Sequence, residues 1–112
     1  MSRRDGAWLT DILAAIDAIT GYLQTGTLNE GVVYDACRAR LIEIGEAVKG
    51  IDASLLATEP LVPWREIARM RDHLTHRYFD TDHAVVQHVV DTELVPLRVA
   101  VERLLDRAVD SP

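Results

Sequence analysis

The 112-residue sequence lacks the features that mark secreted, disulfide-stabilised or membrane-spanning proteins. It contains a single cysteine, Cys37, which excludes an internal disulfide and fits a reducing compartment. No apolar run approaches the roughly 20 residues that cross a bilayer. Its first five residues, MSRRD, lack the apolar stretch of a secretory signal. We therefore expect a cytoplasmic protein that makes no contact with a membrane.

Aromatic residues and positive charge are also scarce. Aromatic residues make up 5% of the chain, which is too few for a protein that binds single-stranded RNA by stacking bases on aromatic rings. The formal net charge of −6 argues against a protein held to nucleic acid by its overall charge. Residues 65–77 are the exception, because they hold four arginines and two histidines against two acidic residues. Since arginine forms forked hydrogen bonds with phosphate, this segment predicts one small anion site.

The length and the hydrophobic pattern predict one all-α domain over residues 1–112. A chain of this length has room for a single hydrophobic core. Apolar residues recur at three- and four-residue steps, which is the spacing of amphipathic helices. We expect an antiparallel up-and-down bundle of four main helices, the last of them broken near Pro96. These helices are expected from Trp8 to Thr25, from Asn29 to Gly50, from Pro63 toward Tyr78, and from Asp80 onward.

Polar residues, glycines and prolines predict where these helices begin and end. Asn29 is expected to cap the second helix, and Pro63 fits the first turn of the third, where its missing N–H is not needed. The sequence Asp80-Thr81-Asp82 supplies caps for the fourth helix. Residues 52–62 are expected to be irregular or to form a short turn of helix.

Two glycines, Gly21 and Gly45, fall inside predicted helices. Each costs about 0.5–1 kcal/mol relative to alanine, so we expect another helix to approach closely at both positions. Glu46 follows Gly45 directly, and its carboxylate is a candidate to face a cleft.

Residues 70–79 hold seven polar or ionisable side chains near the end of the third predicted helix. On an ideal helix Arg71 and Tyr78 share one face about 10 Å apart, whereas His76 lies roughly 140° around from Arg71. A straight helix therefore cannot bring Arg71 and His76 to one atom. Either the helix ends before His76 or the site is assembled from two chains, and we take this difficulty as an argument for a dimer.

A metal site is the competing interpretation of this segment. Six possible ligands lie within twelve residues, but their spacing matches no established ligand set, so we expect no metal. These six are Asp72, His73, His76, Asp80, Asp82 and His83.

Arg71, His76 and Tyr78 form an Arg-x4-His-x-Tyr motif, and the segment around it resembles that of the HepT toxins of the HEPN superfamily. Residues 44–47 (Ile-Gly-Glu-Ala) resemble the Gly-Glu-Ala element on the second helix of that family. Residues 63–67 (Pro-Trp-Arg-Glu-Ile) resemble the start of its third helix. The similarity covers roughly residues 4–107.

This resemblance implies a metal-independent endoribonuclease that needs no cofactor and is the toxin of a toxin–antitoxin pair. In such proteins a homodimer brings two Arg/His sets to a shared cleft that cuts RNA. The antitoxin, a minimal nucleotidyltransferase (MNT), transfers AMP to the motif tyrosine. Carried onto this sequence, Arg71 and His76 are catalytic, Asp72 and Glu46 are supporting residues, and Tyr78 is the site of AMPylation.

The residue types suit metal-free RNA cleavage, in which the ribose 2′-OH attacks the adjacent phosphorus. Histidine titrates near neutral pH and supplies acid–base help of about 10²–10⁴-fold. Arginine stays charged and grips two phosphoryl oxygens at once. One histidine cannot be both acid and base in one step, but two across a two-fold axis can. The alternative is a non-catalytic HEPN module that binds a nucleotidyltransferase partner or a nucleotide.

Overall fold

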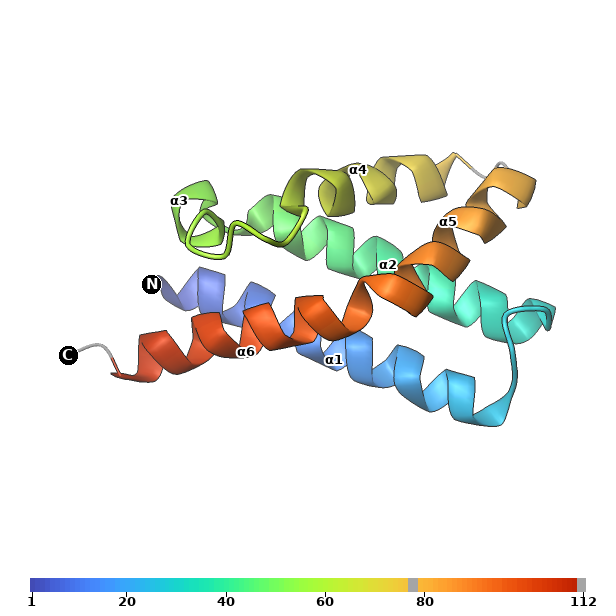
Figure 1. The fold of residues 1–112 in the computed structure, drawn as a ribbon, viewed down its shortest axis with the longest axis horizontal. Helices are drawn as coiled ribbons and strands as arrows, with labels where there is room; N and C mark the ends of the chain where they lie inside the picture. The colour runs from blue at the N-terminus through green and yellow to red at the C-terminus, as the bar shows by residue number, and fades with distance from the viewer. Residues whose placement is uncertain (77–78, 111–112) are drawn as a thin grey trace.

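The computed structural model describes residues 1–76 and 79–110, without the side chains of residues 79–81 and 108–110. Within these ranges the chain is helical and contains no strand, which confirms the all-α class (Figure 1). The helices are α1 (Arg3–Thr25), α2 (Gly31–Gly50), α3 (Ala53–Leu56), α4 (Trp64–Thr75), α5 (Phe79–Thr92) and α6 (Leu94–Asp110). No helix in the described ranges is both long and apolar enough to cross a membrane.

The two long helices α1 and α2 form an antiparallel hairpin, and the other main helices pack around it (Figure 1). Helix α4 lies along α2, and α6 lies along α1, so that α1 begins and α6 ends at the same end of the bundle. Their apolar faces meet in one core, where Cys37 is fully buried. The largest buried side chains of this core are Leu9, Ile12, Ile16, Ile19, Leu41, Ile44, Leu74, Leu97 and Leu104.

Several predicted helix boundaries are confirmed and others are wrong. The break expected near Pro96 falls at Glu93, between α5 and α6, and the short α3 lies in the segment expected to be irregular or briefly helical. Asn29 does not cap α2, because the N-cap residue is Glu30. The Glu30 side chain makes no capping hydrogen bond. Helix α4 ends at Thr75, earlier than expected.

The predicted caps of the fourth helix are also corrected. Helix α5 already begins at Phe79, so Asp82 lies inside its first turn and not at the N-cap position. Its side chain is buried, with a relative exposure of 1%. The side chains of Asp80 and Thr81 lie outside the described residues.

The two helical glycines have different surroundings. At Gly45 an added Cβ would lie 2.5 Å from Cβ of Arg71 and 3.1 Å from the carbonyl oxygen of Ile67, so α4 crosses α2 in close contact there. At Gly21 nothing lies within 4 Å of that position. The expectation of a close helix is thus confirmed at Gly45 and wrong at Gly21.

A buried carboxylate fastens the α3–α4 connection to α6. Glu59 is 7% exposed and accepts hydrogen bonds from Nη2 of Arg103 at 2.7 Å and from Nη2 of Arg107 at 2.8 Å. Its backbone carbonyl accepts a bond from the indole N–H of Trp64 at 3.0 Å. Because Trp64 is the first residue of α4, these contacts fix where that helix starts.

Candidate active site

Arg71 lies at the close crossing of α4 over α2. Its Nε is 2.9 Å from Oε2 of Glu46, the residue that follows Gly45 on α2. Its Nη1 donates to Oδ1 of Asp72 at 3.1 Å. The same Oδ1 accepts a hydrogen bond of 2.7 Å from Nζ of Lys49. Because glycine lets the helices approach, one turn of α2 supplies both a carboxylate and an ammonium to the surroundings of Arg71.

These four side chains form a neutral network of two cations and two carboxylates. All of them are partly exposed, with side-chain exposures between 36% and 52%. The hydrogen bond to Asp72, followed by the charge of Glu46, raises the pKa of the Arg71 guanidinium. The hydrogen bond from Lys49, followed by that from Arg71, lowers the pKa of the Asp72 carboxyl. Both shifts favour the charged forms of Arg71 and Asp72, which are the forms that attract each other.

His76 is the C-cap of α4, with φ −85° and ψ −9°. Its Nδ1 meets the backbone carbonyl oxygen of Asp72, which also accepts a bond from the hydroxyl of Thr75 at 2.9 Å. A carbonyl oxygen only accepts hydrogen bonds, so Nδ1 carries a proton. In the neutral imidazole the lone pair then resides on Nε2, which is the arrangement a general base needs.

Of the two alternatives that the sequence left open, the structure shows a helix that ends before His76. The helix stops before His76, so Arg71 and His76 no longer need to converge on one straight helix. Asp72 links them within a single chain, since its carboxylate binds Arg71 and its carbonyl binds His76. The helical geometry therefore gives no further support to a dimer, which stays a prediction.

A second group of polar contacts joins the end of α4 to α2 and to the start of α5. Nη2 of Arg38, on α2, donates to the carbonyl oxygen of Leu74, one of the last carbonyls of α4. Nε2 of His73 lies 3.2 Å from Oδ1 of the buried Asp82 on α5. These contacts lie on either side of residues 77–78. Tyr78, the predicted modification site, is outside the described residues.

His83, one of the six possible metal ligands, packs against α2. Its side chain is half-buried and stacks on the ring of Tyr34 with centroids 5.2 Å apart. Its Nε2 lies 3.0 Å from the carbonyl oxygen of Leu28. Burial, with the nearby charge of Asp82, raises the pKa of the Tyr34 phenol.

Among the residues that the structure describes, no three His, Cys, Asp or Glu side chains are placed to hold a metal ion. His73 turns toward Asp82, whereas His76 turns back to the Asp72 carbonyl. These two histidines, paired in the metal interpretation, therefore point to different partners.

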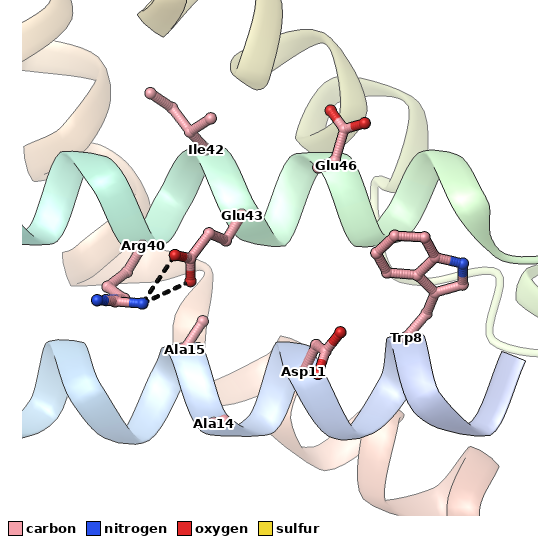
Figure 2. Close-up of a pocket in the computed structure, with 8 residues that line it drawn as sticks. All are labelled: Trp8, Asp11, Ala14, Ala15, Arg40, Ile42, Glu43 and Glu46. Atoms are coloured by element: carbon pink, nitrogen blue, oxygen red, sulfur yellow. Dashed lines mark hydrogen bonds and ion pairs between the residues drawn. The ribbon is translucent and has the colours of Figure 1, made fainter. Parts of the chain in front are cut away.

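Glu46 borders a groove of about 530 Å³ between α1 and α2 (Figure 2). Trp8 and Asp11 line it from α1, while Arg40 and Glu43 line it from α2 and form an ion pair of 2.7 Å. Glu46 lies at the edge of this groove, but its carboxylate points away from α1 and pairs with Arg71 on α4, so a role for Glu46 in a cleft stays a prediction (Figure 2).

Lys49 is the site residue that the sequence did not reveal. It lies 22 positions before Arg71, and no pattern in the sequence connects the two. The available signal was its spacing from Glu46, since residues three apart share one face of a helix.

The fold and the site define an all-helical protein with an arginine and a histidine joined through one aspartate at a helix end. The chain belongs to the HepT-like ribonuclease family, whose model, described as "Ribonuclease HepT-like", matches residues 9–104. The resemblance drawn from the Arg-x4-His-x-Tyr motif is thereby confirmed.

Two archaeal relatives illustrate the similarity. The chain is 32% identical over 110 residues to "Putative RNase MJ0125" of Methanocaldococcus jannaschii, covering 94% of this chain and 95% of the relative. It is also 32% identical over 108 residues to "Probable ribonuclease HepT" of Thermococcus cleftensis, covering 93% and 98%. No solved structure matches the chain significantly.

Proposed function

We propose that this protein is a metal-independent endoribonuclease in which Arg71 and His76 act on one RNA phosphodiester. The observation that carries the proposal is that Asp72 contacts both side chains within one chain, Arg71 through its carboxylate and His76 through its backbone carbonyl. Membership of a ribonuclease family supplies the substrate class. His76 is exposed at the end of α4, and the Arg71 side chain is 36% exposed, so a ligand can reach both.

The reaction forms a bond between the ribose 2′-oxygen and phosphorus and breaks the bond from phosphorus to the 5′-oxygen. The products are a 2′,3′-cyclic phosphate and a 5′-hydroxyl. Nε2 of a neutral imidazole accepts the 2′-OH proton, and a protonated imidazole gives a proton to the leaving oxygen. The Nδ1 contact with the Asp72 carbonyl fixes the ring of His76 for either role.

Arg71 supplies the charge that stabilises the transition state. Its contacts with Glu46 and Asp72 orient the guanidinium and keep it charged. A phosphorane carries extra negative charge on its equatorial oxygens, which a forked donor binds better than it binds the ground state.

We further propose a homodimer with one His76 from each chain, because one imidazole cannot donate and accept a proton in the same step. The mixed dimer of wild-type and His76→Ala chains tests this directly. We expect a large loss of activity from it, whereas full activity would exclude the two-histidine scheme.

The proposed regulation is AMPylation of Tyr78 by a minimal nucleotidyltransferase antitoxin, which makes this chain the toxin of the pair. Tyr78 follows His76 by two residues, so a phosphodiester attached to it would compete with RNA for Arg71. Intact-mass measurement after co-expression with a candidate nucleotidyltransferase should show the addition of whole AMP groups, mapped to Tyr78. A Tyr78→Phe chain should show none.

Cleavage of RNA by purified protein in EDTA tests the enzyme itself. We expect cyclic-phosphate products, and a loss of about 10²-fold or more for Arg71→Ala and for His76→Ala. His88→Ala is the matched control, since His88 is an exposed histidine whose partners are Thr92 and Glu93. If the wild-type protein cuts no RNA but forms a stable complex with a nucleotidyltransferase, the non-catalytic module is the better description.

A further inference from the structure

The anion site contains a second cation that no motif includes. Lys49 Nζ and Arg71 Nη1 contact the same Oδ1 of Asp72, at 2.7 and 3.1 Å. The two nitrogens are therefore separated by no more than the sum of these distances. Two cations this close repel each other unless an anion lies between them, and in the free protein that anion is the Asp72 carboxylate.

We propose that Lys49 is a second ligand for the RNA phosphates. In the free protein, the Asp72 carboxylate occupies the position between Lys49 and Arg71 that a phosphate would take. This inference rests on the proposed function. When a phosphate displaces the Asp72 oxygen, it meets an ammonium and a guanidinium together. The incoming group then exchanges one anionic oxygen for another, so neither cation is left without a partner.

Three other cations of the described chain have partners away from Asp72. Arg38 binds the Leu74 carbonyl, and Arg40 pairs with Glu43 and the Tyr22 hydroxyl. Arg98 binds Asp17 on α1. Lys49 instead shares its partner with Arg71, and its side chain is 38% exposed, which leaves it accessible to a ligand.

The test measures binding of a single-stranded 2′-O-methyl RNA, which lacks the attacking hydroxyl and cannot be cut by the proposed route. Fluorescence anisotropy over a series of salt concentrations gives the slope of log K against log salt. Each lost phosphate contact on a single strand lowers the magnitude of this slope by about 0.7. We expect this loss, with weaker binding of every sequence tested, for Lys49→Gln and not for Lys49→Arg.

Arg40→Gln is the matched control. Arg40 is also a partly exposed cation of α2 held by a carboxylate, but it lies nine residues before Lys49. Nine residues at 100° each place it on the opposite face of the helix. Its slope should equal that of the wild type.

Asp72→Asn supplies an independent readout. It removes the competing carboxylate at nearly constant shape, so RNA binding should tighten. The gain should shrink when Lys49→Gln is also present, because one of the two released cations is gone.

The outcomes separate the two proposals. If the wild type binds RNA through Arg71 but Lys49→Gln keeps the wild-type slope, Lys49 is only a structural partner of Asp72 and this inference is wrong. If the wild type and Arg71→Gln bind RNA equally, or neither binds, the proposed function fails and the role of Lys49 fails with it. Thermal unfolding of each variant confirms that it is folded.

Discussion

Replacing Gly45 by alanine should damage both the fold and the site, because this glycine sets the distance between α2 and α4. The added Cβ would lie 2.5 Å from Cβ of Arg71 and 3.3 Å from its Cα. Neither atom is the end of a flexible side chain, so the helices themselves must separate.

The expected magnitude follows from two opposing effects. Alanine gains about 0.5–1 kcal/mol over glycine inside a helix, whereas overpacking a close contact costs about 1–3 kcal/mol. The net effect at Gly45 is a loss of about 0–2.5 kcal/mol of unfolding free energy, with a central value of about 1 kcal/mol. For a domain near 100 residues, each kcal/mol lowers Tm by about 4 °C or more.

Gly21→Ala is the matched control, because nothing lies within 4 Å of its added Cβ. The same chemical change should there raise stability by about 0.5–1 kcal/mol. Thermal and urea unfolding of both variants beside the wild type measure the contrast.

Activity gives the second readout of Gly45→Ala. Moving Arg71 by about 1 Å relative to Glu46 can cost about 10²-fold in rate. We therefore expect a loss of RNA cleavage under conditions where the variant is still folded, and none for Gly21→Ala. A Gly45→Ala protein as stable and as active as the wild type would refute the reasoning that this close crossing positions Arg71.

Three further predictions concern stability and reactivity. Glu59→Gln should cost about 1–3 kcal/mol, because a nearly buried carboxylate loses its charge-assisted bonds. Hydrogen bonding to Arg103 lowers the pKa of Glu59. The stability that the Glu59 carboxylate contributes is therefore present above its unfolded pKa and is lost as the pH falls through its folded pKa. In urea unfolding, Glu59→Gln should flatten this part of the pH dependence. Cys37 is fully buried and its pKa is raised by burial, so thiol reagents should modify it only after unfolding, and rapid labelling of native protein would contradict its core position. Arg38→Met should lower the unfolding free energy by about 0.5–1.5 kcal/mol and reduce RNA cleavage, because the end of α4 that carries His76 loses its contact with α2. Amide hydrogen exchange at the end of α4 that is as slow as in the wild type would contradict this prediction.

Features that depend on residues close together in the chain could be predicted from the amino-acid pattern alone. Three- and four-residue spacing of apolar side chains gave the helices, and the break at Glu93 followed from Pro96. Burial of Cys37 followed from its place on an apolar stripe. The Arg71–His76 spacing and its flanks pointed to the family, because the motif is local in sequence.

Tertiary structure alone decided the features that join distant segments. At the end of α4 the Leu74 carbonyl accepts a hydrogen bond from Arg38, which lies 36 residues earlier in the chain. Which glycine meets another helix, and which ammonium reaches Asp72, depends on how α2 and α4 cross. The spacing of apolar residues predicts which face of a helix is buried, but it does not predict which other helix packs on that face. The contacts between α2 and α4 therefore cannot be predicted from the spacing alone.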